Sequence, residues 1–232
     1  MERTVVPENF SFRMTDEEYR VLEKIKNSIP VCYLADHADF ALGIVTGNNK
    51  KFLSAEKTEN SEMVLKGTDI CKYHINPVKQ YLRFEPEQFQ QVAPLEIYRA
   101  PEKLLYRFIS NQLVVAYDDR QMLSLNSCNI VIPKIDGMQI KYILAILNSS
   151  VSQFVYQKEF HSIKVLRAHM EHIPIPRVGK AIQNEIIAMT EPLICGMGKE
   201  AAETCQKRLD CRIMDLFRLS AEEQWIIRHA LH

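Results

Sequence analysis

Glycine is scarce in this 232-residue chain, which contains only seven. Proteins that cradle phosphates or dinucleotides commonly use glycine-rich loops, because backbone N–H groups must come close to the ligand. The sequence contains neither a GxGxxG nor a GxxxxGK[ST] motif, and the GxSxG motif of a serine nucleophile is also absent. These absences argue against a nucleotide-binding enzyme and against an α/β-hydrolase.

Motifs for chemistry on DNA are missing as well. Methyl transfer to a base amino group usually needs an Asn/Asp-Pro-Pro-aromatic loop, and "INPV" at residues 75–78 lacks the second proline and the aromatic. A metal-dependent nuclease needs acidic residues followed by a spaced (Asp/Glu)-x-Lys, and no convincing partner follows Asp118 and Asp119. We expect these two carboxylates in a solvated hairpin turn. No nucleophile–base pair stands out, so we expect no catalytic residue and no cofactor.

The six cysteines form no CxxC pair, and we expect reduced thiols in a cytoplasmic protein. Zinc needs about four convergent ligands. Cys71 with His74, and His169 with His172, have ligand-like spacing, but neither pair has a clear second half. We therefore expect no metal. The chain also has no apolar run of about 20 residues and no signal-peptide pattern at its start, so no membrane partner is expected.

Charge is balanced overall and uneven locally. Lysine and arginine total 29, as do aspartate and glutamate, which argues against a protein that coats nucleic acid indiscriminately. Two stretches are basic, however. Residues 66–83 contain four cations and only Asp69, and residues 161–180 contain four cations and only Glu171. Local basic patches thus remain compatible with the sequence.

Periodicity predicts mixed secondary structure. The capping box of Thr15 and Glu18 opens a helix over residues 15–29. Residues 40–45 and 51–55 are expected to form a hairpin around "TGNNK", and residues 62–65 a further strand. A long connection with one short helix should cover residues 76–101, because it holds four prolines.

The second half of the chain begins with three expected strands and ends in helices. Residues 103–109, 112–117 and 127–133 should form an antiparallel meander, followed by helices over 138–148 and 151–160. The "IPIP" at residues 173–176 marks a boundary. Helical patterns follow over 180–195 and 199–217, and Ser220 with Glu223 forms a second capping box.

These elements predict an α/β (α+β) fold with a twisted, mostly antiparallel sheet and a helical C-terminal region. We divide the chain into an N-terminal arm and helix at residues 1–30, a central domain at 31–176 and a helical region at 177–232.

Basic residues, amides and aromatics are interleaved in two segments. Lysine and arginine bind phosphates, whereas asparagine, glutamine and arginine can read base edges. The candidates are Asn48, Asn49, Lys50 and Lys51, and then Lys66, Lys72, Tyr73, Lys79, Tyr81 and Arg83. The alternative is an ordinary solvated face whose aromatics lie in the core.

The order of four sequence blocks resembles the TaqI-like C-terminal specificity domain, which follows the catalytic domain in adenine-specific DNA methyltransferases and type IIG restriction-modification enzymes. The blocks are "GIVTGNNKKF", "VLKGTDICKY", a central "KLLYRFI…VVAYDDRQMLSLNSCNIVIP", and "ILAILNSSVSQFVY…IPIP". The tail "RLDCRIMDLFRLSAEEQWII" is similar to the last helix pair of that family. Lys51 departs from the family pattern, which often has a small residue directly before the phenylalanine of the first block, here Phe52.

The resemblance implies a target-recognition module that binds double-stranded DNA in a restriction-modification system and is not itself an enzyme. Its catalytic partner would be a methyltransferase/endonuclease domain or subunit, and residues 1–30 would be the linker from a missing catalytic domain. We expect DNA contacts from residues 76–101 and from Asn48, Asn49, Lys50, Lys51, Lys66, Lys72, Tyr73, Lys79, Arg83, Arg107, Lys164 and Arg167.

Two further expectations concern geometry. Lys66 and Lys72 would anchor phosphates at the mouth of a cleft and converge with Lys164 and Arg167 on one concave surface. Gly67, Asp69 and Ile70 would shape a turn, with the Asp69 carboxylate capping backbone N–H groups. The competing interpretation is a protein-interaction module that docks a methyltransferase subunit without reading DNA itself.

Overall fold

A four-stranded antiparallel sheet forms the centre of the computed structural model, which describes residues 14–160 and 162–231. Its strands are β2 (Ala38–Ala41), β6 (Lys103–Arg107), β7 (Val115–Asp118) and β9 (Cys128–Pro133), in the order β2-β9-β6-β7. The predicted meander is therefore wrong in one connection, because β9 pairs with β6 and not with β7. After β7 the chain first enters a second sheet and returns on the other side of β6.

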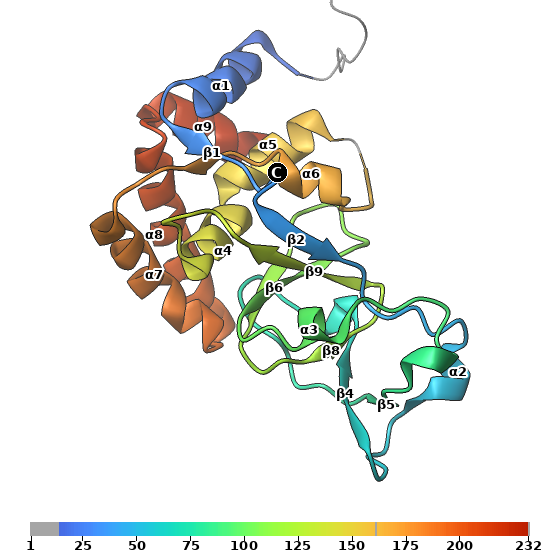
Figure 1. The fold of residues 1–232 in the computed structure, drawn as a ribbon. Coiled ribbons are helices and arrows are strands. Elements are labelled where there is room, and N and C mark those ends of the chain that lie inside the picture. Colours follow the sequence, from blue (N-terminus) through green and yellow to red (C-terminus); the bar gives the residue numbers. More distant parts are fainter. Residues whose placement is uncertain (1–13, 161, 232) are drawn as a thin grey trace, which may run out of the picture.

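The second sheet is small and lies at the far end of the molecule from the long helices (Figure 1). It contains β3 (Leu53–Ser54), β5 (Tyr81–Arg83), β4 (Ser61–Leu65) and β8 (Leu123–Ser124) in that order, and β4 pairs with β8 in parallel. We call residues 42–98 the distal lobe. Besides β3, β4 and β5 it contains α2 (Asn49–Phe52), η1 (Gly67–Asp69), η2 (Pro86–Gln88) and α3 (Leu95–Tyr98).

The predicted hairpin over residues 40–55 is wrong. The side chain of Asn48 accepts a hydrogen bond from the Lys51 N–H at 3.2 Å and caps the helical turn α2, which replaces a tight hairpin loop. As a result β3 pairs with β5, while Ile44 forms a parallel bridge with Leu125. The long connection predicted at residues 76–101 carries the strand β5 in addition to its short helix α3.

Helices cover one face of the central sheet. They are α4 (Ile140–Asn148), α5 (Ser150–Glu159), α7 (Lys180–Ile194), α8 (Lys199–Leu216) and α9 (Ala221–Ala230). The N-terminal α1 (Asp16–Asn27) packs against α9, where Lys24 pairs with Glu223 at 2.5 Å. The short α6 (Arg167–Glu171) follows α5, and β1 (Val31–Cys32) pairs with β10 (Ile175–Pro176). Both predicted capping boxes, at the starts of α1 and α9, are present.

Two hydrophobic cores share the central sheet. In β6, Leu104 and Tyr106 belong to the core beneath the helices, whereas Leu105 belongs to the core between the two sheets. Successive side chains of a strand point to opposite faces, so one run of apolar residues serves both cores. The predicted fold class, a mixed α/β fold with a mostly antiparallel sheet, is confirmed. The division at residues 30 and 176 stays a prediction, and its first 13 residues lie outside the described part of the chain.

The ion pair of Lys103 and Asp118 lies at the edge of β6 and β7, with both side chains fully buried and 2.5 Å between Nζ and Oδ2. The carboxylate also accepts hydrogen bonds from the N–H groups of Arg120 and Met122. The prediction of a solvated turn is therefore wrong for Asp118, because strand pairing with β6 brings the lysine over it. Of the two adjacent aspartates, only Asp119 is exposed.

We expect Lys103→Met to lower the free energy of unfolding by about 3–5 kcal/mol, because it leaves a buried carboxylate without its cation. The double variant Lys103→Met/Asp118→Asn should lose less, since no uncompensated charge remains. Urea denaturation measures both. A double variant that is as unstable as the single variant would contradict this role of the charge.

Candidate nucleic-acid interface

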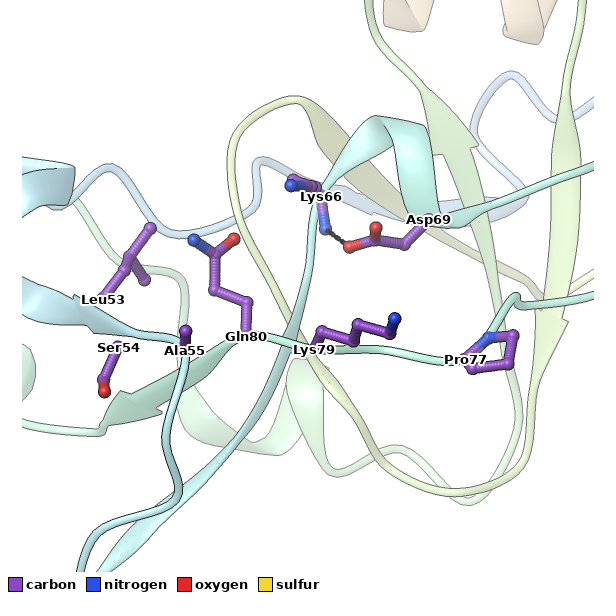
Figure 2. Close-up of a pocket in the computed structure, with 8 residues that line it drawn as sticks. All are labelled: Leu53, Ser54, Ala55, Lys66, Asp69, Pro77, Lys79 and Gln80. Atoms are coloured by element: carbon purple, nitrogen blue, oxygen red, sulfur yellow. Dashed lines mark hydrogen bonds between the residues drawn. The ribbon is translucent and has the colours of Figure 1, made fainter.

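A cavity of about 270 Å³ opens in the distal lobe and brings together two of the predicted lysines (Figure 2). It lies between β3, the end of β4, η1 and the segment that leads into β5. Its lining residues are Leu53, Ser54, Ala55, Lys66, Asp69, Pro77, Lys79 and Gln80. The residues around this cavity thus carry a hydroxyl, an amide, two ammonium groups and one carboxylate.

The turn η1 is held by its own carboxylate and by the central sheet. Asp69 Oδ2 accepts a hydrogen bond from the Lys66 N–H at 2.9 Å, as expected for a capping aspartate. The Gly67 N–H donates to Ser127 Oγ at 3.0 Å. Ile70, which directly follows η1, is fully buried. The turn therefore fixes where the Lys66 backbone lies at the rim of the cavity.

Arg107 supports this turn from beneath. Its Nε donates to the Gly67 carbonyl at 2.9 Å, and its terminal nitrogen donates to the Ile70 carbonyl at 2.7 Å. The side chain is half-buried. Because two of its nitrogens donate to backbone carbonyls at the two ends of η1, Arg107 stabilises this turn. A role of Arg107 in contacting DNA stays a prediction.

Lys66 and Lys79 are exposed cations without a carboxylate partner among the described residues. Gln80 lines the same cavity, and its Oε1 is buried and has no hydrogen-bond partner among the described residues. Unpaired buried polar atoms are uncommon in folded proteins. The cavity therefore combines two ammonium groups and the Asp69 carboxylate, a net positive charge, with an unsatisfied amide oxygen.

The helical turn α2 precedes β3, which lines the cavity. Asn48, Asn49, Lys50 and Lys51 are all exposed on it. Both asparagine carbonyl oxygens are used locally, Asn48 in the cap and Asn49 in a 2.6 Å bond from the Thr46 hydroxyl. The amide N–H₂ groups and the lysine ammonium groups are the parts of this segment that remain directed to solvent.

The structure does not bring Lys72 to this cavity. Its Nζ donates to the Asn148 carbonyl at 3.2 Å, and burial lowers its pKa while the nearby Asp210 raises it. Lys72 lines a different pocket of about 350 Å³, together with residues of α7, α8 and the loop between them. The expectation that Lys66 and Lys72 meet at one cleft is therefore wrong, since η1 separates the two side chains.

Tyr73 is part of the core. Its side chain is 2% exposed, and burial raises its pKa well above the ordinary value. The backbone is left-handed, with φ at 76°. Its hydroxyl lies near the Gln206 amide, yet neither the hydroxyl nor Gln206 Nε2 has a partner with hydrogen-bond geometry. In this conformation the Tyr73 side chain cannot reach a ligand on the surface, which corrects its prediction as a DNA contact.

The remaining candidates lie on other surfaces. Arg83 pairs with Glu85 at 2.8 Å, and Arg167 pairs with Glu171 at 2.7 Å. The Lys164 ammonium lies 6.0 Å from the ring centre of Phe108, at the end of the central sheet. No contact joins Lys164 or Arg167 to the lobe cavity, so the predicted convergence of four cations is not observed.

Sequence reasoning identified the region of Gln80 and missed the residue. Residues 76–101 were expected to contribute to base readout, and Gln80 lies in that segment. Ser54 was missed altogether, because it was assigned to a hairpin that does not form. The pairing of β3 and β5 places both residues, and no local sequence signal specifies that pairing.

We expect Gly67→Ala to destabilise the chain by about 1–3 kcal/mol, because the added Cβ would lie 2.5 Å from the Ser127 carbonyl oxygen and the turn would have to shift. Gly179→Ala is the matched control, since no atom lies within 4 Å of a Cβ there. Thermal unfolding compares the two variants. Equal melting temperatures would contradict the close approach of η1 to β9.

The described residues include no group of three or more histidine, cysteine, aspartate or glutamate side chains that could hold a metal ion. None of the helices described there is long and apolar enough to cross a membrane.

A family model matches the middle of the chain. Residues 62–175 match the TaqI-like C-terminal specificity domain. This range contains the cavity residues Lys66, Asp69, Lys79 and Gln80, and it ends at β10. A search of curated proteins found no match.

Solved structures of restriction-modification proteins resemble the fold. The type IIL enzyme MmeI in complex with DNA aligns with a TM-score of 0.56 and 10% identity, over 82% of this chain and 34% of that one. The HsdS subunit from Thermoanaerobacter tengcongensis gives a TM-score of 0.45 and 16% identity, over 93% and 50%. A type I restriction-modification complex gives 0.47 and 14%, over 93% and 51%. The chain thus spans between a third and half of these proteins, and the likeness to MmeI shows a shared fold.

Proposed function

Because residues 62–175 belong to the TaqI-like C-terminal specificity domain family, we propose that the chain is the DNA target-recognition module of a restriction-modification system. It binds duplex DNA in a sequence-specific way and contributes no catalytic residue. The observation that carries this proposal is the family match, and the cavity of the distal lobe lies largely within the matched range.

The lobe supplies both kinds of contact that a DNA reader needs. Phosphate contacts fix the register of a protein on the duplex, and amides read base edges. Lys66 and Lys79 are the phosphate contacts that we propose, because both are exposed and neither forms an ion pair within the described residues, although the Asp69 carboxylate lines the same cavity. Gln80, Asn48 and Asn49 are the proposed readers, with Lys50 and Lys51 as further backbone contacts.

A neutral chain is compatible with this role. Ten ion pairs are formed within the described residues, and most involve the helices or the central sheet. The cations of the cavity and of α2 are not among them. The distal lobe as a whole has equal numbers of acidic and basic residues, so the positive charge that we propose to meet DNA is confined to the lysines of the cavity and of α2.

The catalytic partner belongs to a separate domain or subunit in this proposal, an adenine-specific DNA methyltransferase or an endonuclease. The helical side of the molecule is the surface that we assign to it, because it lies away from the lobe (Figure 1). It carries two large exposed aromatic side chains, Tyr19 on α1 and Trp225 on α9, which are 51% and 56% exposed. Aromatic residues of this kind are enriched in protein interfaces.

Selection from a randomised duplex pool tests the proposal directly. The 232-residue chain is bound to the pool at low and then moderate salt, and retained duplexes are sequenced. We expect enrichment of one motif that survives the salt increase. Absence of binding even at low salt would overturn the proposal, and binding without enrichment would leave a DNA-binding surface that reads no sequence on its own.

Substitution of the cavity lysines should flatten the salt dependence of binding. Each lost phosphate contact reduces the slope of log affinity against log salt by about 0.9, so Lys66→Ala/Lys79→Ala should reduce it by about 1.8. Arg212→Ala is the control, because this arginine pairs with Glu185 between α7 and α8. Fluorescence anisotropy over a salt series measures both variants. An unchanged slope in the double variant would exclude these lysines as phosphate contacts.

A further inference from the structure

Two loop segments at the end of the central sheet form a short antiparallel ribbon. Ile109 forms a bridge with Lys164. The Ser110 N–H donates to the Ile163 carbonyl at 2.9 Å, and the Val165 N–H donates to the Phe108 carbonyl at 2.8 Å. We call residues 108–112 and 162–166 the tip ribbon. Val165 is 1% exposed, so the ribbon is fixed to the core at its base.

The tip ribbon carries the two most exposed large apolar side chains among the described residues. Ile109 is 60% exposed and Ile163 is 69% exposed. Ile109 lies opposite Lys164 and Ile163 lies opposite Ser110, in adjacent registers of the ribbon. Since side chains alternate between the faces of paired strands, the two isoleucines point to opposite sides. The result is a narrow projection with an apolar side chain on each flank.

The composition of the tip ribbon suits a polyanion. Its ten residues contain no aspartate or glutamate, one lysine, and the exposed amides of Asn111 and Gln112. The Lys164 ammonium faces the Phe108 ring at 6.0 Å and has no carboxylate partner among the described residues. Duplex DNA presents phosphates, base edges and base-pair faces together, and these match the cation, the amides and the apolar side chains of the tip ribbon.

We propose that the tip ribbon is a DNA wedge whose more exposed isoleucine, Ile163, inserts at a base step and partly unstacks it. Apolar wedges of this kind kink a duplex, and the cost of unstacking depends on the step, which adds specificity without hydrogen bonds to bases. Lys164 holds the adjacent phosphate, and Asn111 and Gln112 lie against the neighbouring base edges. This inference rests on the proposed function and names a second DNA contact, separate from the cavity of the distal lobe.

Fluorescence of 2-aminopurine tests the wedge. The probe replaces successive adenines in a duplex of the selected motif, or in a mixed-sequence duplex if no motif is enriched. Addition of the full 232-residue chain should raise the emission several-fold at one step, because unstacking removes quenching. Ile109→Ser/Ile163→Ser should abolish the rise and weaken binding roughly tenfold. The slope of log affinity against log salt should be the same for this double variant as for the parent chain, because no charge is removed.

Two controls separate the wedge from other effects. Met197→Ser removes an apolar side chain that is 38% exposed in the loop between α7 and α8, and it should change neither emission nor affinity. Lys164→Ala should reduce the salt slope by about 0.9 and keep the emission rise at saturation. Unfolding curves of the serine variants should match that of the parent chain, because both isoleucines are exposed.

The outcomes distinguish this inference from the proposed function. Specific binding with no emission rise at any position would overturn the wedge and leave the recognition role in place. Serine variants that bind DNA normally but lose self-association in sedimentation would also overturn it, and would assign the tip to a protein contact. Failure of the parent chain to bind any duplex would overturn both proposals.

Discussion

Strand β6 is the constraint on which the rest of the molecule depends. It is an inner strand of the central sheet, its neighbours are β9 and β7, and its side chains alternate between the two hydrophobic cores. Its first residue, Lys103, is half of the buried ion pair, and its last residue, Arg107, holds the carbonyls of η1. Five consecutive residues thus connect the helical layer, the second sheet and the turn at the cavity.

That connection explains how a small lobe can be rigid enough to read a ligand. Sites built on supported elements are positioned more accurately than sites on free loops. The turn η1 has few apolar contacts of its own, and its stability comes from the Arg107 guanidinium, the Ser127 hydroxyl and the Asp69 cap. Lys66 therefore starts from a fixed backbone position although its side chain is exposed. Gly67 is required by the same arrangement, because its Cα lies against the backbone of Ser127.

The sequence predicted local structure well and long-range pairing poorly. Both capping boxes are local, since the serine or threonine and the glutamate lie three residues apart, and both are present. The hairpin over residues 40–55 failed because the Asn48 cap competes with turn formation, and the meander failed because β8 interrupts it to join β4, about 60 residues earlier. The buried state of Asp118 depends on β6, which the motif of two adjacent aspartates does not reveal. Among the site residues, Lys66 and Lys79 come from one basic segment and line the same cavity. Lys72 lies between them in sequence, yet it lines a different pocket, next to the left-handed backbone of Tyr73.

The ends of the distal lobe lie close together in the central sheet. The chain enters the lobe after β2 and returns to the sheet at β6, and these two strands flank β9, where Ala41 and Leu105 both pair with Ile130. Two strand spacings separate such positions by about 10 Å. In evolutionary terms the lobe is an insertion between two anchor points, and its buried apolar side chains other than Tyr73 belong to the core between the two sheets. A lobe exchanged by recombination at those anchor points would have to supply a strand that pairs with β8 and a side chain that replaces Tyr73 beneath the helices.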